Sequence, residues 1–235
     1  MYTSTGRYHE HSAGADRTLG EVAAAVCGYA PPMTGIYSAR LDEAVAFALA
    51  EFRGRVRKGT RIPYMTHLLQ VMVLVGEHGG DEDQMIAAVL HDWLEDIDGA
   101  RVETLEARWG PRVAGFVVAL SDSVSHPKPP WRARKESYLT RLREEPPEVK
   151  LISTADKLHN CACIRRDHRK MGDAVWERFA GGRAGTLWYY DAVTTALGDN
   201  WSHPLLDELR TDVAEMANAA AATDWGWSPH HPGQP

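Results

Sequence analysis

The sequence predicts an all-α protein, and two observations carry that prediction. Apolar residues recur three and four positions apart through most of the chain, which is the period of a helix with one buried face. Glycine and proline residues fall between these stretches, where they would end one helix and start the next. An alternating pattern of apolar and polar residues, typical of β-strands, is not found at useful length. We therefore expect a single helical domain.

The two ends of the chain have a different composition from the rest. Residues 1–17 are rich in Ser, Gly, Tyr and His without helical periodicity, and residues 224–235 are rich in Pro, Gly and Trp. We expect a flexible N-terminal arm over 1–17, a domain over 18–223 and a flexible C-terminal tail over 224–235.

The first expected helix covers residues 41–57, in which Leu41, Val45 and Phe52 share one face. Arg57 lies at its end, where the helix dipole favours a basic side chain. A loop containing Gly and Pro then follows.

The second expected helix starts near Thr66, which can cap it, and His67 falls in its first turn. Asp81 is a favourable N-cap for the third helix, which is expected to run up to the adjacent pair His91 and Asp92. The remaining expected helices cover residues 102–109, 111–121, 131–143, 148–170, 183–197 and 203–222.

Composition excludes several classes of function. With 26 basic and 32 acidic residues, the net charge is -6, which disfavours a binder of nucleic acid polymers or anionic membranes. A small anionic ligand needs only a few local basic residues. Cys27, Cys161 and Cys163 form neither a disulfide framework nor a zinc-ribbon pattern. No apolar run is long enough to span a membrane or to act as a signal peptide, so we expect a cytoplasmic protein. The oligomeric state stays open.

One apolar helical stretch carries four ionisable side chains. They are His91, Asp92, Glu95 and Asp96 in Ala-Ala-Val-Leu-His-Asp-Trp-Leu-Glu-Asp. On a continuous helix, His91 would share a face with Glu95, and Asp92 with Asp96. Burying a charge without a partner costs several kcal/mol, so this cluster predicts an occupant.

Two other segments supply further ligands. His67 precedes the pair, and Asp156 and Asn160 follow it in Thr-Ala-Asp-Lys-Leu-His-Asn. Asp156 lies near the buried side of its helix, Asn160 lies one turn later on the same face, and Lys157 and His159 are expected to point elsewhere. Two imidazoles and two carboxylates form a plausible ligand set for a divalent cation.

Each of these residues has an ordinary structural explanation when taken singly. A histidine on an apolar helix is usually a hydrogen-bonded core residue. Asp156 could pair with Lys157 or Arg165, and Glu95 and Asp96 could belong to a charged surface. Only the set as a whole favours a metal site.

Three separated blocks carry a resemblance to a known family. They are Arg57-Lys58-Gly59-Thr60-Arg61-Ile62-Pro63-Tyr64-Met65-Thr66-His67, His91-Asp92-Trp93-Leu94-Glu95-Asp96 and Ala155-Asp156-Lys157-Leu158-His159-Asn160. In this order they resemble the HD-domain phosphohydrolases, and most closely the hydrolase half of Rel/Spo alarmone enzymes and the small alarmone hydrolases. The resemblance covers roughly residues 41 to 197 and implies an HD-domain helical bundle with a metal site in its core.

The resemblance also implies roles for particular residues. His67, His91, Asp92 and Asp156 would bind one Mn²⁺. Glu95 and Asp96 would orient or deprotonate the attacking water, Arg57 and Lys58 would contact the nucleotide, and Asn160 would touch its ribose or phosphate. The implied reaction removes the 3′-pyrophosphate from guanosine tetra- or pentaphosphate (ppGpp or pppGpp), which yields GDP or GTP and pyrophosphate.

The expected number of metal ions comes from a comparison with related enzymes, and the ligand set is compatible with more than one metal. Binuclear HD phosphodiesterases, which the chain also resembles, have two further histidines between the His-Asp pair and the final Asp. His126 is the only histidine in that interval here, so one ion is expected. A set of two imidazoles and two carboxylates suits Mn²⁺, and Zn²⁺ or Fe²⁺ would also bind.

Two other groups of residues could contact the substrate, and each also has an ordinary structural interpretation. The basic stretch Trp131-Arg132-Ala133-Arg134-Lys135 could flank the site or form an exposed face, and Trp188, Tyr189 and Tyr190 could stack on a base or belong to the core.

Three other functions remain as alternatives. The first is an HD-type phosphohydrolase of another nucleotide, such as a 5′-nucleotidase or a deoxynucleotide or adenine-type alarmone hydrolase. The second is a catalytically silent nucleotide-binding module. The third is a helical interaction domain without a metal.

Overall fold

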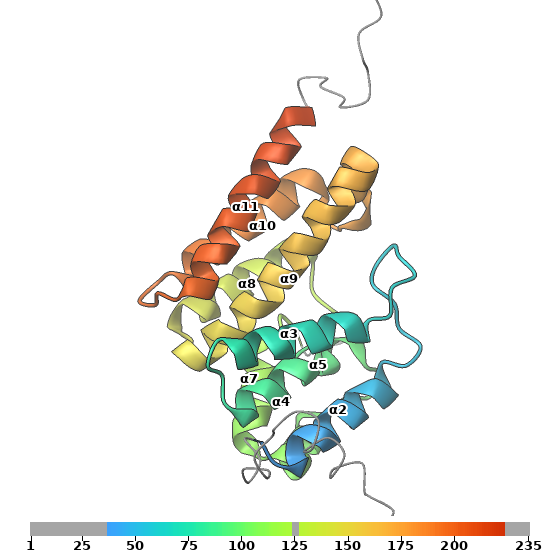
Figure 1. The fold of residues 1–235 in the computed structure, drawn as a ribbon, viewed down its shortest axis with the longest axis vertical. Coiled ribbons are helices and arrows are strands. Elements are labelled where there is room, and N and C mark those ends of the chain that lie inside the picture. The colour runs from blue at the N-terminus through green and yellow to red at the C-terminus, as the bar shows by residue number, and fades with distance from the viewer. Residues whose placement is uncertain (1–36, 124–126, 224–235) are drawn as a thin grey trace, which may run out of the picture. The chain divides into compact units, whose positions relative to one another are not determined.

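The computed structural model describes residues 37–123 and 127–223. Within these ranges the regular structure is helical, apart from one isolated antiparallel bridge between Val56 and Pro63, which confirms the all-α prediction (Figure 1). The expected arm over 1–17 and tail over 224–235 lie outside the described residues, as do 18–36 of the expected domain and His126. None of the described helices is both long and apolar enough to cross a bilayer.

The helices follow one another with short connections. They are α2 (Ala39–Glu51), α3 (Met65–Glu77), α4 (Glu82–Leu90), α5 (Trp93–Asp96), α6 (Val102–Trp109), α7 (Pro111–Leu120), α8 (Trp131–Glu144), α9 (Pro147–Met171), the 3-10 helix η1 (Gly172–Arg178), α10 (Gly182–Leu197) and α11 (Pro204–Thr223).

Helix α2 is shorter than its apolar period predicts. Phe52 is its C-cap and is buried, but Val56, the next residue of the expected apolar face, is 52% exposed. The chain turns at this point and returns through the Val56–Pro63 bridge, with Gly59 in the left-handed region at φ 68°. The prediction of a helix through residue 57 was therefore wrong, and Arg57 lies in a loop.

The start of α3 also differs from the prediction. His67 is in the first turn, as expected, but the N-cap is Tyr64, whose backbone is already helical, and no side chain caps the helix. Thr66 is not the cap, because it already lies inside the helix and its hydroxyl donates to the Pro63 carbonyl at 2.9 Å.

The predicted N-cap of α4 is confirmed. The Asp81 side chain accepts from the backbone N–H of Gln84, and the Gln84 side chain accepts from the backbone N–H of Asp81, which forms a capping box. However, α4 ends at Leu90, and α5 starts at Trp93. The His-Asp pair therefore occupies a break between two helices and not a continuous helix.

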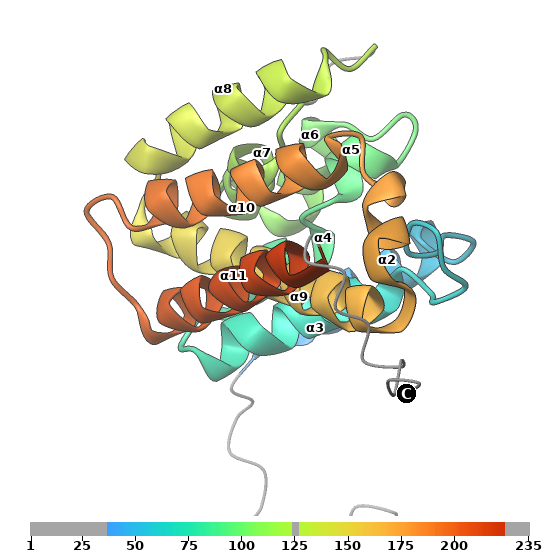
Figure 2. The same ribbon diagram turned by 90° about the horizontal axis from the view of Figure 1, so that it is seen from above.

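The long helix α9 organises the bundle. It contacts α3, α4, α7, α10, α11 and η1. Figure 2 shows α9 between α3 and α10, with α11 alongside. Because α3, α4 and α9 also pack on one another, residues from three distant parts of the sequence meet inside the protein.

Candidate metal centre

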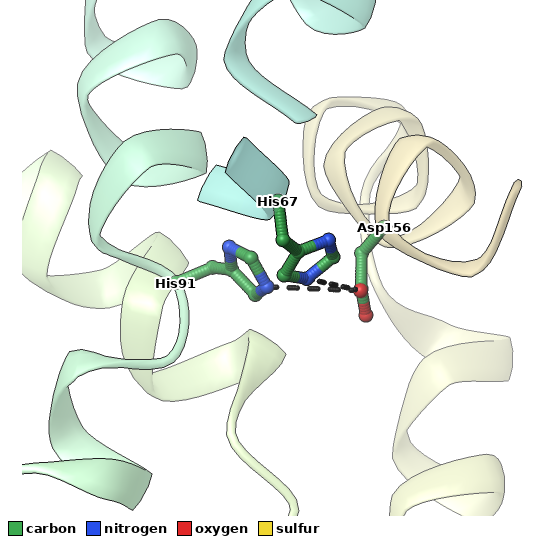
Figure 3. A group of neighbouring side chains, drawn as sticks. All are labelled: His67, His91 and Asp156. Carbon is green, nitrogen blue, oxygen red and sulfur yellow. Dashed lines mark ion pairs between the residues drawn. The ribbon is translucent and has the colours of Figure 1, made fainter. Parts of the chain in front are cut away.

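Two histidines and an aspartate converge at the junction of α3, α4 and α9 (Figure 3). His67 comes from the first turn of α3, His91 from the end of α4 and Asp156 from the middle of α9. One potential ligand atom from each lies within 4.8 Å of the others, and all three residues are buried. Asp156 Oδ1 is 3.2 Å from His67 Nε2 and 3.7 Å from His91 Nε2.

Asp92 joins this group through the same two imidazoles. Its Oδ2 lies 3.0 Å from His91 Nε2 and 3.7 Å from His67 Nε2. The phenol of Tyr64 donates a hydrogen bond of 2.6 Å to that oxygen. Neighbouring side chains diverge by about 100° on a regular helix, so the break after Leu90 explains how His91 and Asp92 reach one point.

The four residues fit a divalent cation. Among the described residues, the Nε2 atoms of His67 and His91 are buried, and the carboxylate oxygens 3.2 and 3.0 Å from them do not have the geometry of a hydrogen bond. His91 Nδ1 lies 2.8 Å from the Ala88 carbonyl, which can only accept, so the neutral ring carries its lone pair on Nε2. This nitrogen, the Nε2 atom of His67 and two carboxylates together form a ligand set of the kind that a transition-metal ion requires.

The electrostatics of the cluster favour ionised carboxylates. Burial by itself would raise the pKa of Asp156, but the Lys157 ammonium and the two imidazoles hold it well below its usual range. Burial lowers the pKa of His67. Burial also opposes the charged form of His91, but Asp92 and Asp156 outweigh burial and raise its pKa. A positive charge at this position is therefore stabilised.

Two residues of α9 contact this cluster although they were expected to point elsewhere. Lys157 donates to Asp156 Oδ2, and His159 Nδ1 lies 2.7 Å from His67 Nδ1. The expectation for His159 was wrong because it follows Asp156 by three positions, which places both on one side of a helix. This spacing was the signal in the sequence that could have identified His159. The expectation for Lys157 was wrong because its ammonium reaches back to the neighbouring carboxylate.

The ordinary explanation of Asp156 as an ion-pair partner holds in part. Lys157 is its partner, whereas Arg165 pairs with Asp212 and Glu215 of α11. Because Lys157 contacts Oδ2, Asp156 Oδ1 still faces the imidazoles.

Glu95 and Asp96 have different environments. Glu95 Oε1 accepts a 2.7 Å hydrogen bond from the backbone N–H of Asp122, and Oε2 lies 3.6 Å from Lys128 Nζ. Burial, with the charges of Asp122 and Asp92, raises the pKa of Glu95 to about 7. Burial and Asp92 also raise the pKa of Asp96. Glu95 lines the cavity described next, and Asp96 is not among its lining residues.

The cluster opens into a cavity of about 670 Å³, within the size range of small-molecule sites. Its basic lining residues are Arg57, Lys58, Arg134, Lys135, Lys157, Arg166 and Arg178. These seven outnumber the five acidic lining residues, Asp92, Glu95, Asp122, Asp156 and Asp167, so the lining is more basic than the protein as a whole and can hold an anionic ligand.

The three expected substrate contacts all line this cavity, and two of them are linked to the cluster. Arg57 donates to the side-chain oxygen of Asn160 and lies 5.4 Å from the ring centroid of Tyr64. Asn160 Nδ2 donates to Asp156 Oδ1 at 2.5 Å. Lys58 lies in the same loop as Arg57.

The stretch that starts α8 divides between cavity and surface. Arg134 and Lys135 line the cavity, so an exposed basic face does not describe them. Arg132 is exposed, and its guanidinium lies 3.3 Å from the ring centroid of Trp188. On α10, the side chain of Tyr189 is buried and lines the cavity, as does that of its neighbour in the sequence, Tyr190.

Comparison with known proteins identifies the family. Residues 44–187 match the HD domain. The guanosine-3′,5′-bis(diphosphate) 3′-pyrophosphohydrolase MESH1 of Drosophila melanogaster is 33% identical over 126 residues, which is 52% of this chain and 68% of that protein. The enzyme of the same type from Aquifex aeolicus is 31% identical over 137 residues, which is 57% of this chain but only 19% of that enzyme.

Solved structures support the same fold. The structure of a metazoan ortholog of SpoT superimposes with a TM-score of 0.61 at 23% identity, and the match covers 79% of this chain and 97% of that one. A Listeria monocytogenes protein, lmo0812, matches with a TM-score of 0.59 at 24% identity, over 65% of this chain and 99% of that one. The match over residues 44–187, together with the sequence identity to MESH1, shows that the chain belongs to the HD-domain family.

Proposed function

We propose that this protein is a metal-dependent hydrolase that removes the 3′-pyrophosphate from ppGpp or pppGpp and releases GDP or GTP and pyrophosphate. The observation that carries the proposal is the pair of buried imidazole nitrogens without hydrogen-bond partners, next to two carboxylates at a cavity lined by basic residues. The relatives named as 3′-pyrophosphohydrolases support the choice of substrate.

One divalent cation would be held by His67, His91, Asp92 and Asp156. We propose Mn²⁺, because imidazole and carboxylate ligands suit it, while Zn²⁺ and Fe²⁺ are also compatible with such a set. A cation bound there would lower the pKa of a water molecule and offset charge on the phosphoryl oxygens.

Glu95 is the proposed proton acceptor. Its pKa near 7 suits a group that takes a proton at neutral pH, and its carboxylate lines the cavity. The water oxygen forms a bond to the phosphorus attached to the ribose 3′ oxygen, and the bond from that phosphorus to the ribose 3′ oxygen breaks. Glu95 takes a proton from the water, a proton passes from Glu95 to the ribose oxygen, and pyrophosphate leaves. Asp96, which interacts with Asp92 but does not line the cavity, is proposed to help orient the attacking water.

Arg57, Lys58 and Asn160 are the proposed nucleotide contacts. A guanidinium can clamp a phosphate through two hydrogen bonds or stack on a purine, and an ammonium supplies a point charge. Because Arg57 donates to Asn160 and Asn160 donates to Asp156, substrate contact and metal site share one hydrogen-bonded chain.

The test is release of pyrophosphate by the purified chain loaded with Mn²⁺. We expect release from ppGpp and none from GDP, which lacks the 3′-pyrophosphate, and we expect Asp92→Ala to abolish it. Absence of turnover with ppGpp, or equal turnover by Asp92→Ala, contradicts the proposal. A panel of other nucleotides, with phosphate and pyrophosphate measured separately, then distinguishes a different HD-type phosphohydrolase from a silent nucleotide-binding module.

Two further proposals concern the binding partner and the cellular location of the protein. The partner is proposed to be a small nucleotide, with no nucleic acid polymer or membrane. The free thiols of Cys161 and Cys163 agree with a reducing compartment, and the cytoplasmic location stays a prediction.

A further inference from the structure

A second group of polar side chains lines the cavity, and the proposed reaction assigns no role to it. Arg134 and Lys135 come from the first turns of α8, and Tyr189 comes from α10, which packs against α8. These two helices are different from those that hold the metal cluster, so the group is a separate part of the cavity wall.

Asp122 holds the two basic side chains in place. Its Oδ1 accepts from Arg134, and its Oδ2 lies 2.8 Å from Lys135 Nζ. All three side chains are largely buried, with 5% of Asp122, 15% of Arg134 and 19% of Lys135 exposed. Asp122 faces both cations, and Glu95, whose Oε1 accepts from the Asp122 backbone N–H, also lies beside this group.

The position of these cations on α8 also favours an anion. The positive end of a helix dipole lies at the N-terminus, where basic side chains are unfavourable and anions are favourable. Helix α8 begins after Pro130, has no acidic residue in its first turn and carries Arg132, Arg134 and Lys135 within its first five positions. A bound anion would satisfy this arrangement.

The hydroxyl of Tyr189 points independently to a ligand. Tyr189 is 93% buried, and within the described part of the chain its hydroxyl has no hydrogen-bond partner. Lys135 Nζ lies 4.7 Å from the centroid of its ring. The neighbouring hydroxyl of Tyr138 shows the usual situation, since it is 2.8 Å from Ser153 Oγ. An oxygen of a ligand in the cavity would supply the partner that Tyr189 lacks.

We propose that Arg134, Lys135 and Tyr189 form a second phosphate subsite, which binds the phosphate of a substrate pyrophosphate that is not attacked. This inference rests on the proposed pyrophosphohydrolase activity and gives it a structural basis for selectivity. A substrate with a single phosphate at the metal would leave the subsite empty. A pyrophosphate would place its distal phosphate against two cations and a phenol donor.

The test measures binding of inorganic pyrophosphate and of orthophosphate to the full chain by calorimetry, with the protein metal-free and, separately, loaded with Mn²⁺. Tyr189→Phe and Lys135→Met each remove one element of the subsite. Tyr138→Phe is the matched control for loss of a buried hydroxyl, and Arg132→Met is the control for loss of a positive charge from the same end of α8.

We expect the wild type to bind pyrophosphate more tightly than orthophosphate. Tyr189→Phe and Lys135→Met should each weaken pyrophosphate binding by about tenfold, as for loss of a hydrogen bond to a charged group. The controls should stay within about twofold of the wild type. Tyr189→Phe should also keep or raise the melting temperature, because it removes a hydroxyl without a hydrogen-bond partner. If the hydroxyl had a structural role instead, the melting temperature would fall.

Equal affinity of the wild type for pyrophosphate and orthophosphate in both metal states overturns the subsite. So does wild-type affinity in Tyr189→Phe and Lys135→Met, or an equal loss in the two controls. These results need no turnover, so they are separate from the test of function. Pyrophosphate binding that depends on Tyr189, in a protein that does not hydrolyse ppGpp, would support the subsite and contradict only the proposed reaction.

Discussion

Glu95 allows the link between stability and catalysis to be measured with one substitution. Its carboxyl group is 17% exposed and lies close to the carboxylates of Asp122 and Asp92. The change Glu95→Gln keeps the shape and an oxygen that can accept from the Asp122 N–H, and it removes the charge. We expect the metal-free variant to be more stable than the wild type at pH 8 and much less active when loaded with metal.

The magnitude follows from the raised pKa. The change from an ordinary value of 4.5 to about 7 means that the folded state binds more protons than the unfolded state between these pH values. Stability therefore falls as pH rises through this range, by up to roughly 3 kcal/mol, because one pKa unit is worth about 1.4 kcal/mol. Loss of the contact with Lys128 offsets part of the gain, so we expect Glu95→Gln to stabilise by about 1–3 kcal/mol at pH 8.

The assay is thermal unfolding of metal-free wild type and variant at pH 5 and pH 8. A gain of 1–3 kcal/mol corresponds to a rise in melting temperature of roughly 2–10 °C for a domain of this size. The difference should be small at pH 5, where the wild-type carboxyl is already protonated. Pyrophosphate release should fall by about 10²–10⁴-fold, the range for loss of a general base. A variant that is less stable at pH 8, or a difference that is the same at both pH values, would refute the reasoning.

Three further outcomes are expected. Because Glu95 must be ionised to accept a proton, kcat/KM for ppGpp should rise with pH and level off at or above about 7, and a profile that falls over this range contradicts its role. Tyr64→Phe removes the hydrogen bond to Asp92 and should weaken Mn²⁺ binding by about 10- to 100-fold in a competition titration, whereas unchanged affinity would show that the bond does not orient the ligand. Gly59→Ala should raise KM severalfold, because φ at this position is 68° and the added Cβ would lie 2.7 Å from Arg178 Nε, which would displace the loop that carries Arg57 and Lys58. Gly54→Ala, where the added Cβ meets no atom within 4 Å, is the control. Equal KM values in the two variants would exclude this effect.

The apolar period was sufficient to predict the helical class and most helix positions. The capping box at Asp81 depends only on residues three apart, so it could also be foreseen. The end of α2 could not, because Val56 continues the period although the chain has already turned, and only the bridge from Val56 back to Pro63 explains the turn. Local pattern and tertiary contact disagree at that point, and the tertiary contact decides.

The candidate site shows the same division. The residue types and their order in three blocks predicted which side chains would gather near His67. The break between Leu90 and Trp93 has no glycine or proline to mark it, so the pattern favoured a continuous helix. The contact between His67 and His159 joins residues 92 positions apart, and such a contact depends on how α3 and α9 pack.

The convergence of α3, the α4–α5 junction and α9 on one point has a consequence for the life of the protein in the cell. An ion held there would bind three segments that are far apart in the sequence, and because it binds only the folded state, it would raise the free energy of unfolding. Chelating agents would then act as denaturants. The supply of cations would set the fraction of molecules that resists proteases, and so the abundance of the protein as well as its turnover rate.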